Sequence, residues 1–314
     1  MRPLILALAL AASPAAAEDL TLLSFNIYGG GANDDKPVDE TVAVLKAVDA
    51  DIAGIQETRL ESEDCEADYC PADGPSVAPA LAEAMSYQVY EQTAENEALW
   101  ANAVMSRFPI TGQSPNDLGV GIDVNGREVW IFNVHLDDEP YGPYQVVGIE
   151  YGPAPFVDNA ADAIMWAQDT RGGAMELLMS DIEAVAAEAD LVIVTGDFNE
   201  PSGRDWTEEV AALGTHPIGV DWPTTRILED AGFVDAYRAV HPDPVEKPAF
   251  TWTPMWSTED DPEDHHDRID FIFVRGEGVE VLSAEIVGET GERTDLAVDP
   301  WPSDHRAVRA TVSF

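Results

Sequence analysis

Hydrophobic residues in this chain gather in short runs, several of which end in a polar side chain. The clearest run is 191–194, which is followed by Thr195, Gly196, Asp197 and, two residues later, Asn199. An unbroken apolar run rich in β-branched residues is typical of a strand buried on both faces. Asp197 and Asn199 would then lie at a strand end, where α/β proteins place their chemistry. An ordinary Asx turn explains the same residues, so both interpretations stay open here.

Four further strands with polar residues at or near their ends are predicted: 20–27 with Asn26, 50–56 with Glu57, 130–136 with His135, and 268–274 with Asp270. A carboxylate at the end of a buried run is unfavourable unless it is paired. Arg59, two residues away, and a metal ion are the two candidate partners of Glu57. A lone His at a strand end is more often a hydrogen-bonded core residue than a catalyst, so His135 receives no role from its position alone.

Apolar spacing of three and four residues predicts amphipathic helices over 37–48, 77–85 and 224–231. Gly172 and Gly173 interrupt a longer helical pattern, so we place the main helix at 174–188. Segment 137–168 is rich in Tyr, Gly and Pro and is predicted to be mainly a long loop. Its residues Tyr141 and Tyr144 either line a substrate pocket or pack the loop onto the surface.

Two segments near the C-terminal third complete the pattern. Residues 250–253 are predicted to form a strand, and 259–267 an acidic turn that contains His265 and His266. Such a turn could bind a cation, but a solvated loop is the more common outcome.

The chain has 314 residues, of which 45% are hydrophobic, and no repeat or long linker divides it. We therefore expect one domain over 18–314. Before it, Arg2, an apolar run over 4–12 and Ala15 to Ala17 predict a secretory signal peptide over 1–17. The run is far shorter than the roughly 20 residues that span a bilayer, and no later segment is long and apolar enough. The mature protein is therefore expected to be periplasmic or secreted, and monomeric.

Cys65 and Cys70 are the only two cysteines. In an oxidising compartment they are expected to form a local disulfide, with two free thiols as the alternative.

The net charge of the chain limits which partners it can bind. With 60 acidic and 16 basic residues the formal net charge is −44. Binding to nucleic acid depends on Lys and Arg that neutralise phosphates, and a field of this sign repels polyanions. Nucleic acid is therefore a disfavoured substrate. Because acidic clusters also arise by chance in such a chain, only carboxylates at strand ends are given weight.

Asp304 and His305, which precede the last strand over 307–314, join the polar strand ends described above. If these ends meet, carboxylate and carboxamide oxygens predominate in the site, with two imidazoles beside them. Such oxygens suit Mg²⁺ or Mn²⁺ better than zinc. Carboxylates that bind a cation, together with imidazoles near phosphate oxygens, indicate metal-assisted hydrolysis of a phosphoester.

Six short motifs occur in the same order as in a known superfamily: 24–26 (SFN), 56–57 (QE), 133–136 (NVHL), 196–199 (GDFN), 268–271 (RIDF) and 303–305 (SDH). On these motifs the chain resembles the endonuclease/exonuclease/phosphatase superfamily, which includes deoxyribonuclease I, AP endonucleases, inositol polyphosphate phosphatases and neutral sphingomyelinases. The resemblance implies an α+β fold, a four-layer α/β/β/α sandwich of two packed mixed β-sheets with outer helices.

The resemblance also implies roles. Glu57 would be the main metal ligand, helped by Asn26 and Asp304, while Arg59 would contact a phosphate. Asp197 would orient or deprotonate the attacking water. The remaining catalytic residues would act on the phosphoryl group or the leaving group: Asn199, His135, and His305 paired with Asp270. The number of metals, and which imidazole is acid and which is base, stay open.

We therefore expect an exported metal-dependent phosphoesterase that acts on a small or lipid-linked phosphodiester or phosphomonoester. A secreted deoxyribonuclease-like endonuclease is the alternative. A third hypothesis is a catalytically inactive binding module on the same fold.

Overall fold

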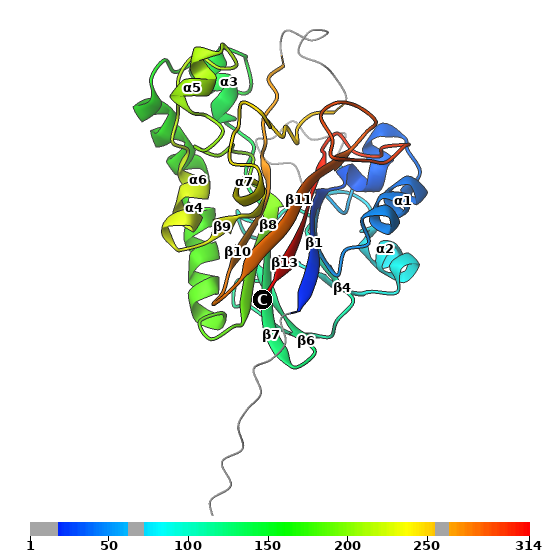
Figure 1. Ribbon diagram of the computed structural model, residues 1–314. Coiled ribbons are helices and arrows are strands. Elements are labelled where there is room, and N and C mark those ends of the chain that lie inside the picture. The colour runs from blue at the N-terminus through cyan, green and yellow to red at the C-terminus, as the bar shows by residue number, and fades with distance from the viewer. Residues whose placement is uncertain (1–17, 62–71, 255–263) are drawn as a thin grey trace, which may run out of the picture.

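The computed structural model describes residues 18–61, 72–254 and 264–314 (Figure 1). The predicted signal peptide over 1–17 and the predicted disulfide between Cys65 and Cys70 lie outside the described residues. Among the described residues, no helix combines the length and the apolar character needed to cross a membrane.

Two β-sheets form the centre of the described part of the chain. The seven-stranded sheet has the order β12 (Leu296–Ala297), β11 (Glu280–Gly288), β13 (Ala307–Ser313), β1 (Asp19–Asn26), β2 (Ile52–Gln56), β4 (Ala103–Ser106), β3 (Gln88–Glu91). The six-stranded sheet has the order β5 (Ile110–Gln113), β6 (Gly119–Val124), β7 (Arg127–His135), β8 (Leu191–Asp197), β10 (Asp270–Arg275), β9 (Val234–Asp235). Both are mixed, because β1 and β2, like β7 and β8, are parallel, whereas β13 and β10 run antiparallel to their neighbours β1 and β8.

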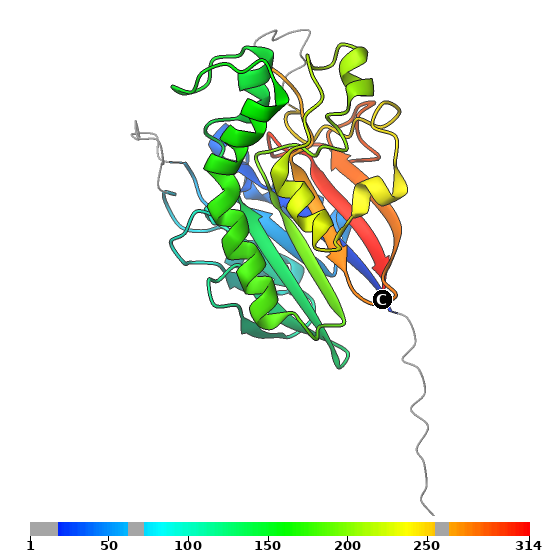
Figure 2. The same ribbon diagram turned by 90° about the vertical axis from the view of Figure 1, so that its left-hand side faces the viewer.

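Helices cover the outer faces of both sheets. Between the strands lie η1 (Tyr28–Asp34), α1 (Val38–Val48), α2 (Ala78–Met85), α3 (Gly142–Val147), α4 (Ala160–Val185), α5 (Glu208–Ala212), α6 (Pro223–Asp230) and α7 (Ala236–Val240). Helices α1 and α2 pack on the seven-stranded sheet. Helix α4 crosses the outer face of the six-stranded sheet (Figure 2). The predicted four-layer α/β/β/α sandwich is confirmed.

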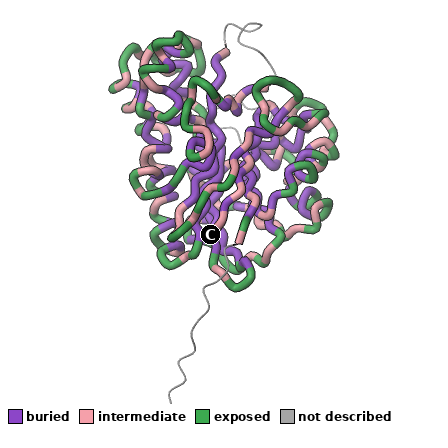
Figure 3. The backbone as a smooth tube through the Cα atoms, in the orientation of Figure 1, coloured by how far each residue is buried: buried purple, intermediate pink, exposed green. Residues whose placement is uncertain are grey.

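Side chains point alternately to the two faces of each strand, and this alternation divides the core into three layers. In β1, Leu20 and Leu22 point between the sheets, whereas Leu23 and Phe25 face α1 and α2. The same alternation holds in β7 and β8, so the buried strands occupy the middle of the molecule and the helices expose their outer sides (Figure 3). Because neighbouring side chains on a strand point to opposite faces, both faces of these strands are apolar, as their continuous hydrophobic runs require.

The layer between the sheets changes from apolar to polar along the strands. Further along β1 and β8, the inward positions that follow the apolar ones are Ser24 and Thr195. Ser24 Oγ accepts a hydrogen bond from the Gly196 N–H at 3.0 Å, and Thr195 Oγ1 donates to Asn133 Oδ1 at 3.1 Å. Gly54 lies where β2 approaches these side chains. The two sheets are thus joined by polar contacts at one end of the layer and by hydrophobic packing at the other.

The main helix is longer than predicted. Instead of 174–188 it spans Ala160–Val185, and Asn159 caps it by accepting a hydrogen bond from the Asp162 N–H at 3.0 Å. The helix passes through both glycines. At Gly173 a Cβ would overlap the Glu97 carboxylate, which would have to move aside. The predicted loop over 137–168 is also shorter, because α3 and the start of α4 lie within it.

Gly54→Ala tests the close approach of the two sheets. A Cβ at this position would overlap Thr195 Oγ1 and lie 2.6 Å from Asn133 Oδ1. Overpacking of this kind typically lowers the free energy of unfolding by about 1–3 kcal/mol. We expect that loss in urea denaturation followed by circular dichroism.

Gly172→Ala is the matched control. Apart from its chain neighbours and the backbone of its own helix, no described atom lies within 4 Å of a Cβ built at this position, and the residue is inside α4. Replacing a mid-helix glycine with alanine should raise the stability by roughly 0.5–1 kcal/mol. Equal effects of the two substitutions would contradict the role given to Gly54.

Candidate active site

The polar strand ends meet at one edge of the sandwich. Register pairs His135 with Asp197 across parallel strands, and Asp197 with Asp270 across antiparallel ones. From the other sheet come Asn26 at the end of β1, Glu57 directly after β2, and Asp304 and His305 shortly before β13. Beside them is a cavity of about 470 Å³, whose lining includes Glu57, His135, Asp197, Asn199, Asp304 and His305. The convergence that the sequence hypothesis required is therefore present.

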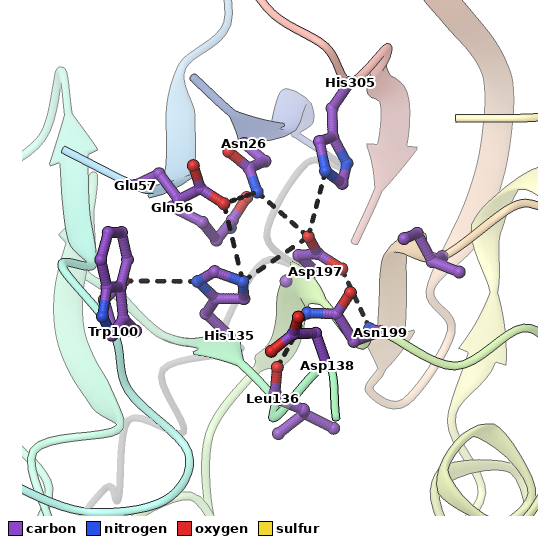
Figure 4. A network of polar contacts seen from close by, with 12 residues as sticks. Asn26, Gln56, Glu57, Trp100, His135, Leu136, Asp138, Asp197, Asn199 and His305 are labelled. Carbon is purple, nitrogen blue, oxygen red and sulfur yellow. Dashed lines mark hydrogen bonds and ion pairs between the residues drawn. The ribbon is translucent and has the colours of Figure 1, made fainter. Parts of the chain in front are cut away.

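Asp197 is the centre of this arrangement (Figure 4). Its Oδ2 accepts a hydrogen bond from Asn26 Nδ2 at 3.0 Å and lies 3.5 Å from His305 Nε2 and 3.7 Å from His135 Nε2. Asn26 Nδ2 also donates to Glu57 Oε1 at 2.7 Å. One carboxamide thus connects two buried carboxylates from different sheets.

His305 is held by Asp270 on the side away from Asp197. The distance between His305 Nδ1 and Asp270 Oδ2 is 2.9 Å, and both residues are buried. Burial alone would lower the pKa of His305, but the carboxylates of Asp270, Asp197 and Asp304 raise it well above its ordinary value. Burial raises the pKa of Asp270 to about 6, against the opposing influence of His305. The imidazole is therefore held as a cation, with one nitrogen fixed and the other directed at Asp197.

The carboxylates of the site fit a divalent cation. Burial, and then the charge of Asp304, raise the pKa of Glu57 well above its ordinary value. Among the described atoms, Glu57 Oε2, Asp304 Oδ1 and Asp270 Oδ1 are buried without a hydrogen-bond partner. Ligand atoms of Glu57, His135 and Asp197 lie within 4.8 Å of one another. Buried acceptors that repel each other need a positive charge, and oxygen-rich groups of this kind suit a hard cation.

Asn26 and Arg59 each have a hydrogen-bond partner within the described chain. Asn26 Oδ1 accepts the Tyr28 N–H at 3.1 Å and keeps a second lone pair, so its role as a metal ligand stays a prediction. Arg59 donates to the Gly74 carbonyl at 3.1 Å and is outside the cavity lining. Among the described residues Arg59 forms no ion pair with Glu57, and its contact with a phosphate stays a prediction.

Asn199 occupies the rim of the site. Its N–H donates to Asp197 Oδ1 at 2.9 Å, and its Nδ2 donates to the Leu136 carbonyl at 2.9 Å. Asn199 and Glu57 both have a positive φ, of 46° and 53°. This left-handed backbone is uncommon outside glycine, and here it turns both side chains at the strand ends.

The acidic turn over 259–267 was predicted to be solvated, and this is wrong for its described end. His265 and His266 are 9% and 3% exposed. Asp267 is buried as well, and it accepts hydrogen bonds from Trp206 Nε1 at 2.7 Å and from the Tyr141 hydroxyl at 2.9 Å. Tertiary hydrogen bonds from distant segments explain the burial, and the local composition carries no sign of them.

The predicted strand over 250–253 is reduced to single bridges from Trp252 to Asp267 and to His305. This tryptophan is a site residue that the sequence analysis missed. Its indole N–H donates to the Asp304 carboxylate, and its ring lines the cavity. Trp100 was missed too. Its ring meets the His135 ring edge-on, with centroids 5.9 Å apart, and its carbonyl lies 3.4 Å from His135 Nδ1. Both tryptophans lie in loops without a motif that would identify them.

Comparison with known proteins agrees with this geometry. A sequence profile of the endonuclease/exonuclease/phosphatase family matches residues 23–305. The chain belongs to the endonuclease/exonuclease/phosphatase family. Members of this family are hydrolytic phosphoesterases and nucleases that generally depend on a divalent metal.

Three similar proteins cover nearly the whole chain. An uncharacterized protein of Caenorhabditis elegans is 26% identical over 94% of this chain and 91% of its own length. An exodeoxyribonuclease of Bacillus subtilis is 25% identical over 94% of this chain and 100% of its own length. The structure of the 3′ phosphatase NExo from Neisseria, bound to a product DNA hairpin, has a TM-score of 0.53 at 17% identity and covers 93% of this chain and 98% of that one. The last similarity concerns the fold.

Glu57→Gln tests whether the family's metal binds at this site. A ligand at 100 times its dissociation constant stabilises a protein by about 2.7 kcal/mol, so Mg²⁺ or Mn²⁺ should raise the melting temperature of the wild type by several degrees. The variant should lose most of this rise. Without metal it should be at least as stable as the wild type, because a buried, repelled carboxylate is gone.

Glu83→Gln, on the exposed side of α2, is the control and should keep the full rise. Differential scanning calorimetry with and without EDTA measures both variants. An unchanged metal response in Glu57→Gln would place the ion elsewhere.

Proposed function

We propose that this family member is an exported phosphoesterase that uses Mg²⁺ or Mn²⁺ to hydrolyse a small or lipid-linked phosphoester. The observation that carries the proposal is the convergence of Glu57, Asp197 and His305, from both sheets, beside one cavity of about 470 Å³. Export is inferred from the predicted signal peptide over 1–17.

The side chains divide the reaction between them. Asp197, which lies between both imidazoles, orients or deprotonates the attacking water. His305, kept cationic and fixed by Asp270, stabilises the charge that develops on the phosphoryl group, with His135 on the other side of Asp197. Asn199 contributes a polar contact at the rim. A divalent cation held by Glu57, Asp304 and Asp197 would neutralise this cluster and polarise a phosphoryl oxygen.

A secreted nuclease is the second candidate. It is favoured by the 25% identity with the exodeoxyribonuclease of Bacillus subtilis and by the DNA hairpin in the Neisseria structure. The charge of this chain opposes it. The formal net charge is −44, and among the described residues that line the cavity none is Lys or Arg. A strand of nucleic acid brings several phosphates, and each would need a cation that this surface does not supply.

Asp197→Asn separates an enzyme from an inactive binding module. Loss of a residue that positions or deprotonates the nucleophile typically lowers the rate by about 10²–10⁴-fold, and kcat should fall by that factor. The assay is hydrolysis of bis-p-nitrophenyl phosphate with Mg²⁺, which EDTA should abolish. A binding module would give no metal-dependent hydrolysis in wild type or variant.

Asp230→Asn, at the exposed end of α6, is the control and should keep full activity. In the same assay, cleavage of plasmid DNA at moderate salt as fast as that of the small diester would favour the nuclease instead.

A further inference from the structure

Aromatic rings form one wall of the cavity beside the candidate metal ligands. Tyr141, Tyr144, Tyr151 and Trp252 all line it. Tyr144 is nearly perpendicular to Tyr141 and to Tyr151, with interplanar angles of 88° and 84° and centroids 5.0 and 5.9 Å apart. Trp252 lies at 53° to Tyr144 with centroids 6.1 Å apart. Neighbouring rings therefore meet edge to face or tilted instead of stacked, and we call these four residues the aromatic box.

From this wall and the charges around it, we propose that the substrate is a phosphoester of an alcohol that carries an organic cation, such as a quaternary ammonium. The phosphate would lie at the metal ligands and the cation against the aromatic box. The inference rests on the proposed phosphoesterase function and specifies its substrate class. Hydrolysis joins the oxygen of one water to phosphorus and breaks one ester P–O bond. The departing alkoxide takes a proton, so no other co-reactant is needed.

Each tyrosine hydroxyl is held by a carboxylate, which lies outside the cavity lining for Tyr141 and Tyr144 and within it for Tyr151. The hydroxyl of Tyr141 donates to Asp267 at 2.9 Å, that of Tyr144 to Asp264 at 2.9 Å, and that of Tyr151 to Asp138. A phenol that donates to a carboxylate gains electron density on its ring, which strengthens the attraction between ring and cation. The rings of Tyr141 and Tyr144 are also buried and hydrogen-bonded before a ligand arrives, so little rotamer entropy is lost on binding.

The remaining lining supplies negative charge and no positive side chain. Five carboxylates line the cavity apart from the candidate metal ligands: Glu61, Glu97, Asp137, Asp138 and Glu139. None of the described lining residues is Lys or Arg, and segments 62–71 and 255–263 contain neither residue in the sequence. With a divalent metal at its ligands to compensate the phosphate, the rest of the cavity is complementary to a cation.

Other substrates suit this lining less well. A nucleotide chain adds phosphates next to five carboxylates, so like charges would meet. A neutral polyol could donate its hydroxyl hydrogens to the carboxylates, but it carries no positive charge to compensate theirs. A quaternary ammonium needs no hydrogen-bond partner, and aromatic boxes with nearby negative charge are the usual way in which proteins bind it.

The test compares two esters that differ in charge alone. One is p-nitrophenyl phosphorylcholine, and the other is its 3,3-dimethylbutyl analogue, in which carbon replaces the ammonium nitrogen. We expect kcat/KM to be about tenfold higher or more for the choline ester, as a desolvated cation–π contact provides. The preference should decrease with added NaCl, because salt screens the carboxylates.

Variants of the box assign the preference. Tyr144→Leu should bring the ratio of the two kcat/KM values close to one, whereas Tyr144→Phe, which keeps the ring, should retain most of it. Phe156→Leu is the control, because Phe156 is 54% exposed and outside the lining. Soluble glycerophosphocholine and vesicles of phosphatidylcholine then distinguish a free from a lipid-linked source of the same group, and cleavage of either supports the proposal.

Equal kcat/KM for the two esters, with both cleaved in a metal-dependent reaction, would overturn the cation proposal and leave the phosphoesterase proposal intact. If neither ester nor the bis-p-nitrophenyl ester is cleaved, the proposed function fails. Titration of tryptophan fluorescence with phosphocholine and with 3,3-dimethylbutyl phosphate then decides the cation proposal alone. Tighter binding of phosphocholine supports it, and equal dissociation constants overturn it.

Discussion

The site depends on how closely the two sheets pack at the polar end of their shared layer. Gly54 lets β2 approach β7 and β8, and Asn133, Gln56 and Thr195 form the contacts there, with Gln56 Nε2 donating to Asn133 Oδ1 at 2.5 Å. Glu57 follows Gln56 directly. Because the reacting groups come from both sheets, a small slide between the sheets would separate Glu57 from Asp197 while leaving each sheet intact. Buried polar contacts have directional geometry, so they fix this alignment in a way that apolar packing cannot.

This arrangement divides stability and chemistry along one direction. At the apolar end of the layer between the sheets, buried side chains such as Leu22 and Ile193 stabilise the sandwich. At the polar end lie the carboxylates of Glu57 and Asp304. Burial raises the pKa of both, and the charge of Asp304 raises that of Glu57 further. Packing does not explain carboxylates that repel each other in a buried site, since apolar residues at these positions would make the folded protein more stable. The apolar part of the layer offsets this repulsion, and a bound cation would relieve it.

The sequence carries those parts of the structure that follow from local patterns. Strand ends such as Asn26, His135 and Asp197 are recognisable because an apolar run, which predicts the buried strand, stops at a polar residue, and the six ordered motifs identify the fold. The start of α4 cannot be recognised from the sequence, because a helix continues through Gly172 and Gly173 when its neighbours pack against it. The burial of His265 and His266 cannot be recognised either. It depends on hydrogen bonds from segments more than a hundred residues away, such as that of Tyr141 with Asp267. The role of Trp252 has the same origin, since only the folded chain brings it to Asp304.

The large negative charge and the cavity act in the same direction. A surface with a formal net charge of −44 lowers the local concentration of polyanions and raises that of cations, most strongly in a concave site with low-dielectric walls. The same field that opposes a nucleic-acid strand therefore draws a divalent ion to Glu57 and an ammonium group to the rings around Tyr144. A substrate with one phosphate and one cationic group meets little net repulsion on entry. Its phosphate is then the single anion whose charge a bound metal and His305 must compensate, and a site with so few cationic side chains can do this for one phosphate.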